Sequence, residues 1–360
     1  MSREGTSPEV VVEALGVPIG IPVTGAAADR LRRQWSRALT DRDPATVVDL
    51  EHLDGHDPVA LDYALTSRVT LAALDATAGS RVNLHAGAVA DDEGRALAVV
   101  GASGSGKTTA VHHLARRLGY LSDETTSVDE GLLVHPHPKP LSVITDADAP
   151  RVKQSLSPDD LGLLRAPATS YLHRIVLLHR GEDDSGLVPL APARAIAEIV
   201  SQTSSLPRLE DPVRRLADML DACGGAWGLR YRELEHWVDD LVGLLDVEGQ
   251  PPLPRLHHPG RRTDDPAGDD PAPHAWVRAS WRDAVEYDDE LVVMVGDRVH
   301  VLAGLGVVLW LALEVPRTTD DLLAEVRELW GDHPDAVGLV TGALELLAQE
   351  GLLHAPDAAG

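Results

Sequence analysis

Residues 96–109 read ALAVVGASGSGKTT, which is the strongest structural signal in the chain. From Gly101 to Thr108 it satisfies the phosphate-loop pattern G-x-x-x-x-G-K-[ST]. The apolar residues before the pattern predict a strand, and Thr109–Leu118 predicts a helix, which is the context that a phosphate loop requires. A chance glycine-rich turn is the alternative, but the pattern and both of its flanks agree. The sequence therefore predicts a binding site for a nucleoside triphosphate.

Each part of this loop has a chemical task. Glycines let the backbone wrap around phosphate oxygens, while successive N–H groups and the helix N-terminus point at the anion. The Lys107 ammonium would neutralise the terminal phosphates of ATP, and the Thr108 hydroxyl would bind Mg²⁺. The predicted nucleotide-binding residues are Gly101, Ala102, Ser103, Gly104, Ser105, Gly106, Lys107, Thr108 and Thr109.

Two neighbouring carboxylates follow the predicted helix. Residues 117–124 read RLGYLSDE, which indicates a helix end, a short turn and a strand edge that brings Asp123 and Glu124 back beside the loop. One carboxylate could accept the proton of an acceptor hydroxyl, and the other could hold Mg²⁺. A solvated acidic turn explains the same residues, so their chemistry alone leaves both interpretations open.

A histidine lies on the other side of the loop. Residues 84–87 read LHAG and belong to a predicted strand, Val82–Ala90, that pairs with the strand feeding the loop. His85 could face the γ-phosphate or orient the base, although a lone histidine in a strand is more often structural. The sequence contains no guanine-reading N-K-x-D motif, and the apolar run 174–179 ends in a histidine rather than in a metal-binding acid.

Composition excludes several classes of function. The chain has 57 Asp and Glu against 32 Lys and Arg, a net charge of −25, which argues against binding to nucleic-acid backbones or anionic membranes. Its one cysteine, Cys223, cannot form an internal disulfide, and no run of apolar residues is long enough to span a membrane. We therefore expect a soluble, cytoplasmic protein.

The chain divides into two predicted domains. Residues 249–274 hold seven prolines and few large apolar side chains, which predicts a disordered linker between residues 1–248 and 275–360. Strands alternating with helices give the first part an α/β class. Its predicted helices are 26–39, 58–78, 107–118, 192–202 and 212–222. The second part predicts three strands, 284–287, 290–295 and 298–302, and then helices 306–313, 319–329 and 336–349.

Residues 70–240 resemble one family. The segments LHAGAV, AVVGASGSGKTT and RRLGYLSDE occur in the order found in HPr kinase/phosphorylase-like P-loop kinases, whose fold is related to phosphoenolpyruvate carboxykinase. The resemblance implies that His85, Lys107 and Asp123 are catalytic, with Asp123 as the general base. It implies Mg²⁺ ligands at Thr108 and at Glu124, where the family usually has a second aspartate. The glycine-rich signature loop of true HPr kinases is missing, so HPr is not the expected substrate.

Residues 276–355 are similar to PqqD-like domains, the precursor-peptide recognition elements of ribosomal peptide biosynthesis. The segments RVHVLAGLGVVLW, PRTTDDL and LLAQEGLL carry this likeness. It implies a small winged-helix-like α+β domain in which a leader peptide adds to the strand near Arg298–Val301, with the last helix, Ala336–Leu347, as the other wall. A DNA-binding winged helix is the alternative, and the acids of this module argue against it.

Together these features predict an ATP- and Mg²⁺-dependent kinase that phosphorylates a Ser or Thr hydroxyl of a ribosomally synthesised precursor peptide, as in lasso-peptide tailoring. A nucleotide-gated peptide chaperone without phosphotransfer and a small-metabolite kinase are the alternatives. The family resemblance also admits a homo-oligomer. Residues 1–70 are expected to form an α/β lead-in without an assigned function.

Overall fold

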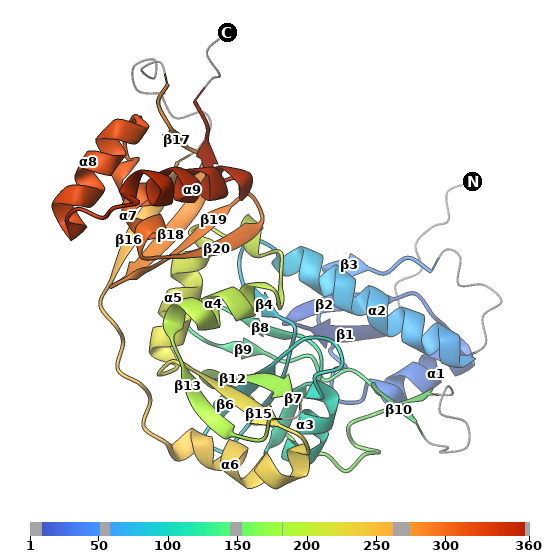
Figure 1. Cartoon of the computed structure of the whole chain (residues 1–360). Helices are drawn as coiled ribbons and strands as arrows, with labels where there is room; N and C mark the ends of the chain where they lie inside the picture. Colours follow the sequence, from blue (N-terminus) through green and yellow to red (C-terminus); the bar gives the residue numbers. More distant parts are fainter. Residues whose placement is uncertain (1–8, 51–57, 145–152, 182, 262–273, 357–360) are drawn as a thin grey trace, which may run out of the picture. The chain divides into compact units, whose positions relative to one another are not determined.

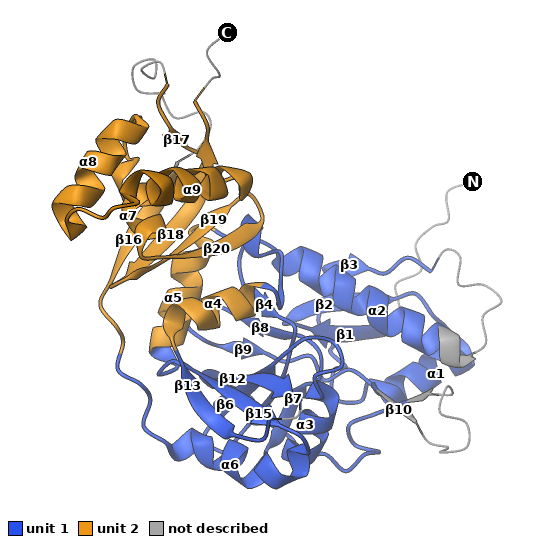
Figure 2. Ribbon diagram, viewed as in Figure 1, with its two compact units in different colours: residues 1–190, 201–209, 222–251 blue, residues 191–200, 210–221, 252–360 orange. Residues whose placement is uncertain are grey.

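The computed structural model describes residues 9–50, 58–144, 153–181, 183–261 and 274–356. The chain forms two compact units (Figure 1), which Figure 2 colours blue and orange. Unit 1 comprises residues 1–190, 201–209 and 222–251, and unit 2 comprises residues 191–200, 210–221 and 252–360. Both units combine helices with β-sheet, so the protein is a mixed α/β structure, as the sequence predicts.

A six-stranded sheet carries the phosphate loop of unit 1. Its strands are β5 (Ala86–Ala90), β6 (Arg95–Val100), β7 (Gly119–Ser122), β12 (Tyr171–Arg180), β13 (Gly186–Leu190) and β15 (Ala226–Tyr231). Their order is β13–β15–β12–β6–β5–β7. Strand β12 is parallel to both β6 and β15, whereas β5 is antiparallel to both β6 and β7.

The centre of this sheet is apolar because helices and 3₁₀ turns cover it. The loop helix α3 (Lys107–Leu114) and the helix α6 (Val238–Gly243) share one buried cluster with the strands, in which Val99, Val111 and Leu241 are wholly enclosed. A sheet covered in this way needs continuous apolar runs rather than alternation, and ALAVV before the loop is such a run. The 3₁₀ turns in the described residues are η1 (Leu206–Arg208), η2 (Leu234–Trp237) and η3 (Leu244–Asp246).

The predicted strand Val82–Ala90 is divided at His85. Strand β4 (Val82–Leu84) belongs to a second sheet, of order β14–β4–β8–β9, whereas β5 belongs to the six-stranded sheet. The other strands of that second sheet are β8 (Thr126–Val128), β9 (Val134–His135) and β14 (Thr203–Ser204). The N–H of His85 donates to the carbonyl of Gln202 at 2.6 Å, so His85 marks the point where the chain changes sheets.

The N-terminal residues form a block with a core of its own. It contains β1 (Val10–Ala14), β2 (Val17–Ile21), β3 (Thr46–Val47), α1 (Gly25–Gln34) and α2 (Pro58–Thr77), which confirms both predicted helices, the first with an earlier end. A separate hairpin pairs β10 (Leu141–Ile144) with β11 (Lys153–Leu156). Helix α2 is long, yet no helix in the described parts of the chain combines the length and apolarity needed to cross a bilayer.

Unit 2 is built on a four-stranded antiparallel sheet, β16–β18–β19–β20. The predicted three-strand meander is confirmed as β18 (Trp281–Tyr287), β19 (Glu290–Val295) and β20 (Arg298–Ala303). The prediction of a linker over 249–274 is wrong for Arg255–Arg261, which form β16 and pair with β18. The part of that prediction covering 262–273 lies outside the described residues.

The three predicted C-terminal helices are confirmed as α7 (Leu305–Ala312), α8 (Thr319–Trp330) and α9 (Ala336–Gln349). They cover one face of the sheet, where Leu291 and Val293 share a buried cluster with Trp310 and Leu344. Thr318 caps α8 in a capping box with the third helical residue. A short ladder pairs β17 (Val277–Arg278) with β21 (Leu353–His354).

Two helices expected in the first domain group with unit 2 instead. Helix α4 (Pro192–Val200) lies against β19 and β20, and α5 (Pro212–Ala222) belongs to the same unit. Val285, Val292 and Met294 of the sheet are fully buried although they do not belong to the cluster under α7–α9. The compact units therefore do not divide at residue 248, because the C-terminal sheet needs upstream helices to bury its second face.

Polar contacts explain how a segment with few apolar residues forms β16. Arg255 bonds two carboxylates of α5, Asp218 at 2.6 Å and Asp221 at 2.8 Å. His258 lies 2.7 Å from Glu286 of the neighbouring strand. Main-chain pairing and ion pairs thus hold this edge strand, and edge positions also tolerate its proline. Hydrophobic content alone could not reveal it.

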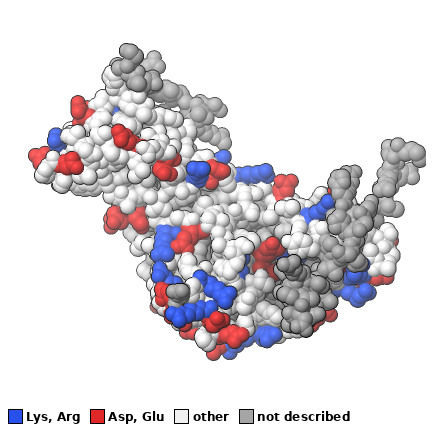
Figure 3. Space-filling view, turned by 45° about the vertical axis from the view of Figure 1, so that its right-hand side comes forward, with Lys and Arg blue, Asp and Glu red and all other residues white. Residues whose placement is uncertain are grey.

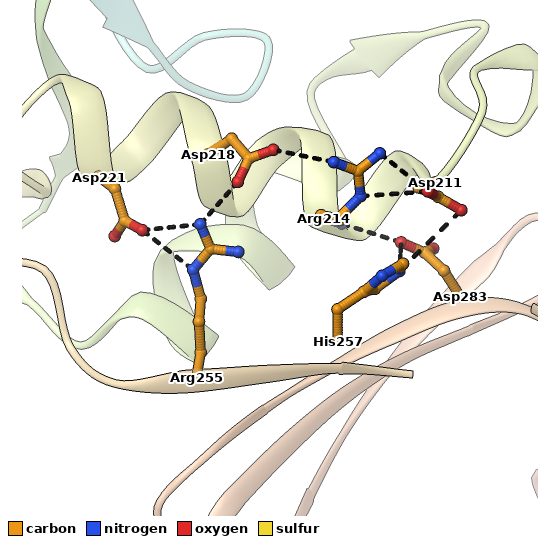
Figure 4. A network of polar contacts seen from close by, with 7 residues as sticks. All are labelled: Asp211, Arg214, Asp218, Asp221, Arg255, His257 and Asp283. Atoms are coloured by element: carbon orange, nitrogen blue, oxygen red, sulfur yellow. Dashed lines mark hydrogen bonds and ion pairs between the residues drawn. The ribbon is translucent and has the colours of Figure 1, made fainter. Parts of the chain in front are cut away.

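Helix α5 is anchored to the sheet by a buried carboxylate (Figure 4). Asp283 of β18 accepts hydrogen bonds from the N–H groups of Val213, at 3.2 Å, and Arg214, at 2.9 Å. These first-turn amides have no acceptor within the helix. His257 lies 3.6 Å from Asp283 and 4.0 Å from Asp211. Burial raises the pKa of Asp283, while the two amides and His257 oppose that rise.

Replacing Asp283 with alanine leaves two buried amides of α5 without an acceptor. We expect the free energy of unfolding to fall by about 1–3 kcal/mol, the cost of unpaired buried polar groups. Urea denaturation of Asp283→Ala measures this loss. The matched control is Asp288→Ala, which removes an exposed carboxylate from the following turn. Equal stability of the two variants would contradict the anchoring role.

Candidate active site

Sheet topology brings three predicted segments to one edge of the six-stranded sheet. Because β5 is antiparallel to both β6 and β7, the carboxyl ends of β6 and β7 lie at the same edge as the amino end of β5. The phosphate loop follows β6, Asp123 follows β7, and His85 precedes β5. The fold therefore places the predicted loop, acid and histidine at the same edge, from three separate parts of the sequence.

These segments line a cleft of about 900 Å³ in unit 1. Most predicted site residues face it: His85, Ser103, Gly104, Gly106, Lys107, Thr108, Thr109, Asp123 and Glu124. Gly101, Ala102 and Ser105 belong to the loop but are not among the residues lining the cleft. The cleft is also lined by Tyr63, His112, His113, Arg116, Lys139 and Arg180.

The loop has the close packing that its glycines suggest. Gly104 and Gly106 have φ values of +83° and +89°, which side chains rarely adopt. A Cβ atom on Gly101 would lie 2.4 Å from the Ser105 hydroxyl, and one on Gly106 would lie 2.5 Å from the Tyr231 hydroxyl. The Ser105 hydroxyl is buried and has no hydrogen-bond partner among the described residues. The loop is thus a narrow cradle with an unused polar group.

Lys107 folds back over this cradle. Its ammonium donates to the carbonyls of Gly101, at 2.5 Å, and Ala102, at 3.1 Å. Burial lowers the pKa of Lys107, and the charge of Glu124 opposes that effect. The Lys107 ammonium and the unpaired Ser105 hydroxyl can bind phosphate oxygens. The Thr108 hydroxyl and the nearby Glu124 carboxylate can bind Mg²⁺, so this set of groups fits a Mg²⁺-bound triphosphate. The residues therefore fit the predicted ligands.

Asp123 is buried and closely partnered. Its carboxylate accepts a hydrogen bond from the Tyr120 hydroxyl at 3.2 Å and lies 3.1 Å from the Lys139 ammonium. The same ammonium lies 3.2 Å from Glu124, whose side chain is about half exposed. From the sequence, Lys139 could contact phosphate or the acceptor, or be an exposed turn lysine, and the structure buries it. Its rarity was the available signal, because it is one of three lysines in a chain of net charge −25.

The surroundings of His85 favour its neutral form. Burial lowers the pKa of His85, the positive charge of Lys107 lowers it further, and Glu124 acts in the opposite direction. A neutral imidazole can donate or accept a hydrogen bond but cannot serve as a cation for phosphate. This state is compatible with the predicted role of orienting a base or an acceptor.

Arg180 and Tyr63 are site residues that the sequence did not reveal. Arg180 ends β12, which runs parallel to β6, so its exposed guanidinium reaches the edge of the phosphate loop. The apolar run 174–179 supplies no metal-binding acid, and the arginine that follows it was the signal in the sequence. Tyr63 comes from α2, so the N-terminal block contributes to the cleft. Only tertiary packing could show that contribution.

A group of side chains spaced like the ligands of a metal ion lies in unit 2, not in the unit that carries the phosphate loop. Within the described ranges, Asp211, His257 and Asp283 of unit 2 are the one group of His, Cys, Asp or Glu whose ligand atoms lie within 4.8 Å of one another. Helix amides and the Arg214 guanidinium already bond these carboxylates, so we interpret the group as the α5 anchor. Thr108 and Glu124 would instead complete their metal site with phosphate oxygens, as Mg²⁺ sites in nucleotide enzymes do.

Surface charge gives no sign of a broad basic area on the face drawn in Figure 3. Most of that face belongs to uncharged residues, and the Lys and Arg patches on it lie among Asp and Glu patches. A surface that binds nucleic-acid backbones needs a continuous excess of cations. The expectation that the protein does not bind nucleic acid stays a prediction.

The chain matches no protein-family model and no curated protein. The resemblance to HPr kinase-like and PqqD-like proteins therefore stays a prediction from the sequence motifs.

The two left-handed glycines of the loop differ in what surrounds them. We expect Gly104→Ala to lower the free energy of unfolding by about 1–2 kcal/mol, the cost of an alanine in this backbone region. Gly106→Ala should lose more, because its Cβ meets the Tyr231 hydroxyl, whereas no atom lies within 4 Å of a Cβ on Gly104. Urea denaturation measures both losses.

A Tyr231→Phe background supplies the control for this comparison. Without the hydroxyl, the closest ring atom lies at an ordinary 3.7 Å from the added Cβ. Part of the Gly106→Ala loss should then be recovered in a double-mutant cycle. Equal losses at the two glycines, with no recovery, would contradict the described packing of the loop.

Proposed function

We propose that this chain is an ATP- and Mg²⁺-dependent kinase of the HPr kinase-like type, acting on a Ser or Thr hydroxyl of a ribosomally synthesised precursor peptide. One observation carries the proposal: the phosphate loop, Asp123 and His85 come from three separate segments and meet in one cleft. A chance loop motif would not require a buried acid and a histidine at the same sheet edge.

The chain's own residues would divide the work of phosphoryl transfer. The loop amides and Lys107 hold the phosphates, while Thr108 and Glu124 hold the metal, which neutralises charge on the β- and γ-oxygens when bound. Asp123 accepts the proton of the acceptor hydroxyl. At the same time the hydroxyl oxygen bonds to the γ-phosphorus, and the bond between the γ-phosphorus and the β-phosphate oxygen breaks. A neutral His85 orients the acceptor or the base. A loose transition state asks mainly for such positioning.

Unit 2 would capture the leader of the peptide. In the described part of the chain, β20 pairs with β19 alone, so its other edge is available for a further strand. The exposed apolar side chains of Val301 on β20, and of Leu339 and Leu346 on α9, suit an apolar leader. Holding the leader raises the local concentration of the acceptor to roughly millimolar, so the cleft itself needs few contacts with the peptide.

This function belongs in the cytoplasm, where ATP and nascent precursor peptides are both present. The winged-helix-like arrangement of β18–β20 with α7–α9 is part of the same proposal. The order of three antiparallel strands followed by three helices supports it.

Asp123→Asn tests the kinase assignment. We expect the rate of phosphopeptide formation to fall by about 10²- to 10⁴-fold, the usual worth of a positioned acid or base. Nucleotide affinity should persist, because the phosphate loop is unchanged. Mass spectrometry of a candidate precursor peptide incubated with ATP measures the gain of one phosphoryl group.

The control is Asp92→Asn, which changes an exposed carboxylate in the turn between β5 and β6. It should phosphorylate at the rate of the unchanged protein. Normal phosphorylation by Asp123→Asn would contradict the assigned base.

A nucleotide-gated peptide-binding protein without phosphotransfer is the second candidate. The ion pair between Lys139 and Asp123 favours it, because this contact engages the carboxylate that a kinase needs. This candidate predicts ATP-dependent peptide binding with no phosphopeptide formed by the unchanged protein.

The leader site is tested by charge insertion at the strand edge. Val301→Glu places a carboxylate where the proposal seats an apolar peptide side chain, and we expect the affinity for a fluorescent leader peptide to fall at least tenfold. Val315→Glu is the matched control, since Val315 is also exposed but lies before α8, away from the strand edge. Equal leader affinity of both variants in fluorescence anisotropy would place the peptide elsewhere.

A further inference from the structure

Main-chain hydrogen bonds hold the segment of unit 1 that carries Lys139. Its N–H donates to the carbonyl of His137, and the N–H of His137 donates to Leu121 of β7 at 3.0 Å. The preceding Pro136 accepts a hydrogen bond from Leu15 of the N-terminal block. His137 is wholly buried, and burial lowers its pKa to about 3, so it adds no second positive charge beside Lys139.

The ammonium of Lys139 is enclosed between two acids. Its side chain is only 7% exposed, and it lies 3.1 Å from Asp123 and 3.2 Å from Glu124. The lysine ammonium therefore lies between two adjacent acids and compensates one of their negative charges.

A cation between these two carboxylates is an electrostatic requirement. Neighbouring carboxylates repel each other, and a buried carboxylate without a counter-charge is strongly disfavoured. The proposed function also assigns one of these two acids, Glu124, to a divalent metal. An amine and a metal ion cannot both occupy the same point between the two acids.

We propose that Lys139 is a built-in counter-cation, which occupies the place of a divalent metal between Asp123 and Glu124 until a metal–nucleotide complex binds. This inference rests on the proposed function and adds a regulation to that site. The nucleotide-free protein then has little affinity for free metal. When a nucleotide-borne metal reaches Glu124, the ammonium loses one partner and becomes available to phosphate oxygens in the same cleft.

Mn²⁺ binding to the nucleotide-free, full-length protein tests the inference by electron paramagnetic resonance. Lys139→Met removes the counter-cation, and we expect Mn²⁺ to bind at least tenfold more tightly than to the unchanged protein, because two uncompensated charges then face the metal. Lys139→Arg keeps the charge and should bind Mn²⁺ weakly. Arg208→Met removes a positive charge outside the cleft, where Arg208 pairs with exposed Asp75. This variant should bind Mn²⁺ with the affinity of the unchanged protein. Equal Mn²⁺ affinity of Lys139→Met and the unchanged protein overturns the inference.

A second measurement follows the Lys139 side chain in the unchanged protein by nuclear magnetic resonance. The chain has three lysines, so [¹³Cε]-lysine labelling gives three resonances, and Lys139→Arg identifies the one that belongs to Lys139. Mg²⁺ with a non-hydrolysable ATP analogue should shift that resonance, whereas Mg²⁺ alone should leave it in place. A Lys139 resonance that the metal–nucleotide leaves unmoved overturns the inference. Neither readout involves phosphoryl transfer, so either can succeed even where the kinase assignment fails.

Discussion

The site depends on the direction of three neighbouring strands. Antiparallel β5 lies between β6 and β7, so these two strands end at the edge where β5 begins. This arrangement sets the phosphate loop beside the residue after β7 and the residue before β5. The cleft at this edge also holds Lys107 and Lys139, two of the three lysines of a strongly acidic chain. Reversing β6 or β7 would separate the acid from the loop, and reversing β5 would move His85 to the opposite edge.

The sequence could predict the groups whose spacing is dictated by local backbone chemistry. The pattern from Gly101 to Thr108 requires a strand before it and a helix after it, and the structure has both as β6 and α3. His85 and Asp123 flank strands of the same sheet, and their place beside the loop could be predicted from the strand pairing before the loop and the short turn after its helix. Lys139 could not be assigned in this way, because its role depends on long-range packing of the segment before β10.

The organisation of unit 2 was harder to predict. The strands β18–β20, the helices α7–α9 and the Thr318 cap follow from periodicity and capping chemistry. The strand β16 escaped notice because main-chain pairing and polar contacts, such as that of Arg255 with α5, replace apolar burial. The membership of α4 and α5 could not be read from their sequence, since an amphipathic helix does not reveal which sheet it covers. Both helices lie between segments of unit 1 in the sequence but belong to unit 2 in the fold.

We infer that Gly101–Thr108 holds a triphosphate whose terminal phosphate faces Asp123. A crystal structure of the full chain with Mg²⁺ and a non-hydrolysable ATP analogue would show where the nucleotide lies. We expect the β-phosphate in the loop, the Lys107 ammonium turned from the carbonyls of Gly101 and Ala102 to the phosphates, and the γ-phosphate pointing toward Asp123. A nucleotide bound outside the loop, or a γ-phosphate directed away from Asp123, would overturn this inference.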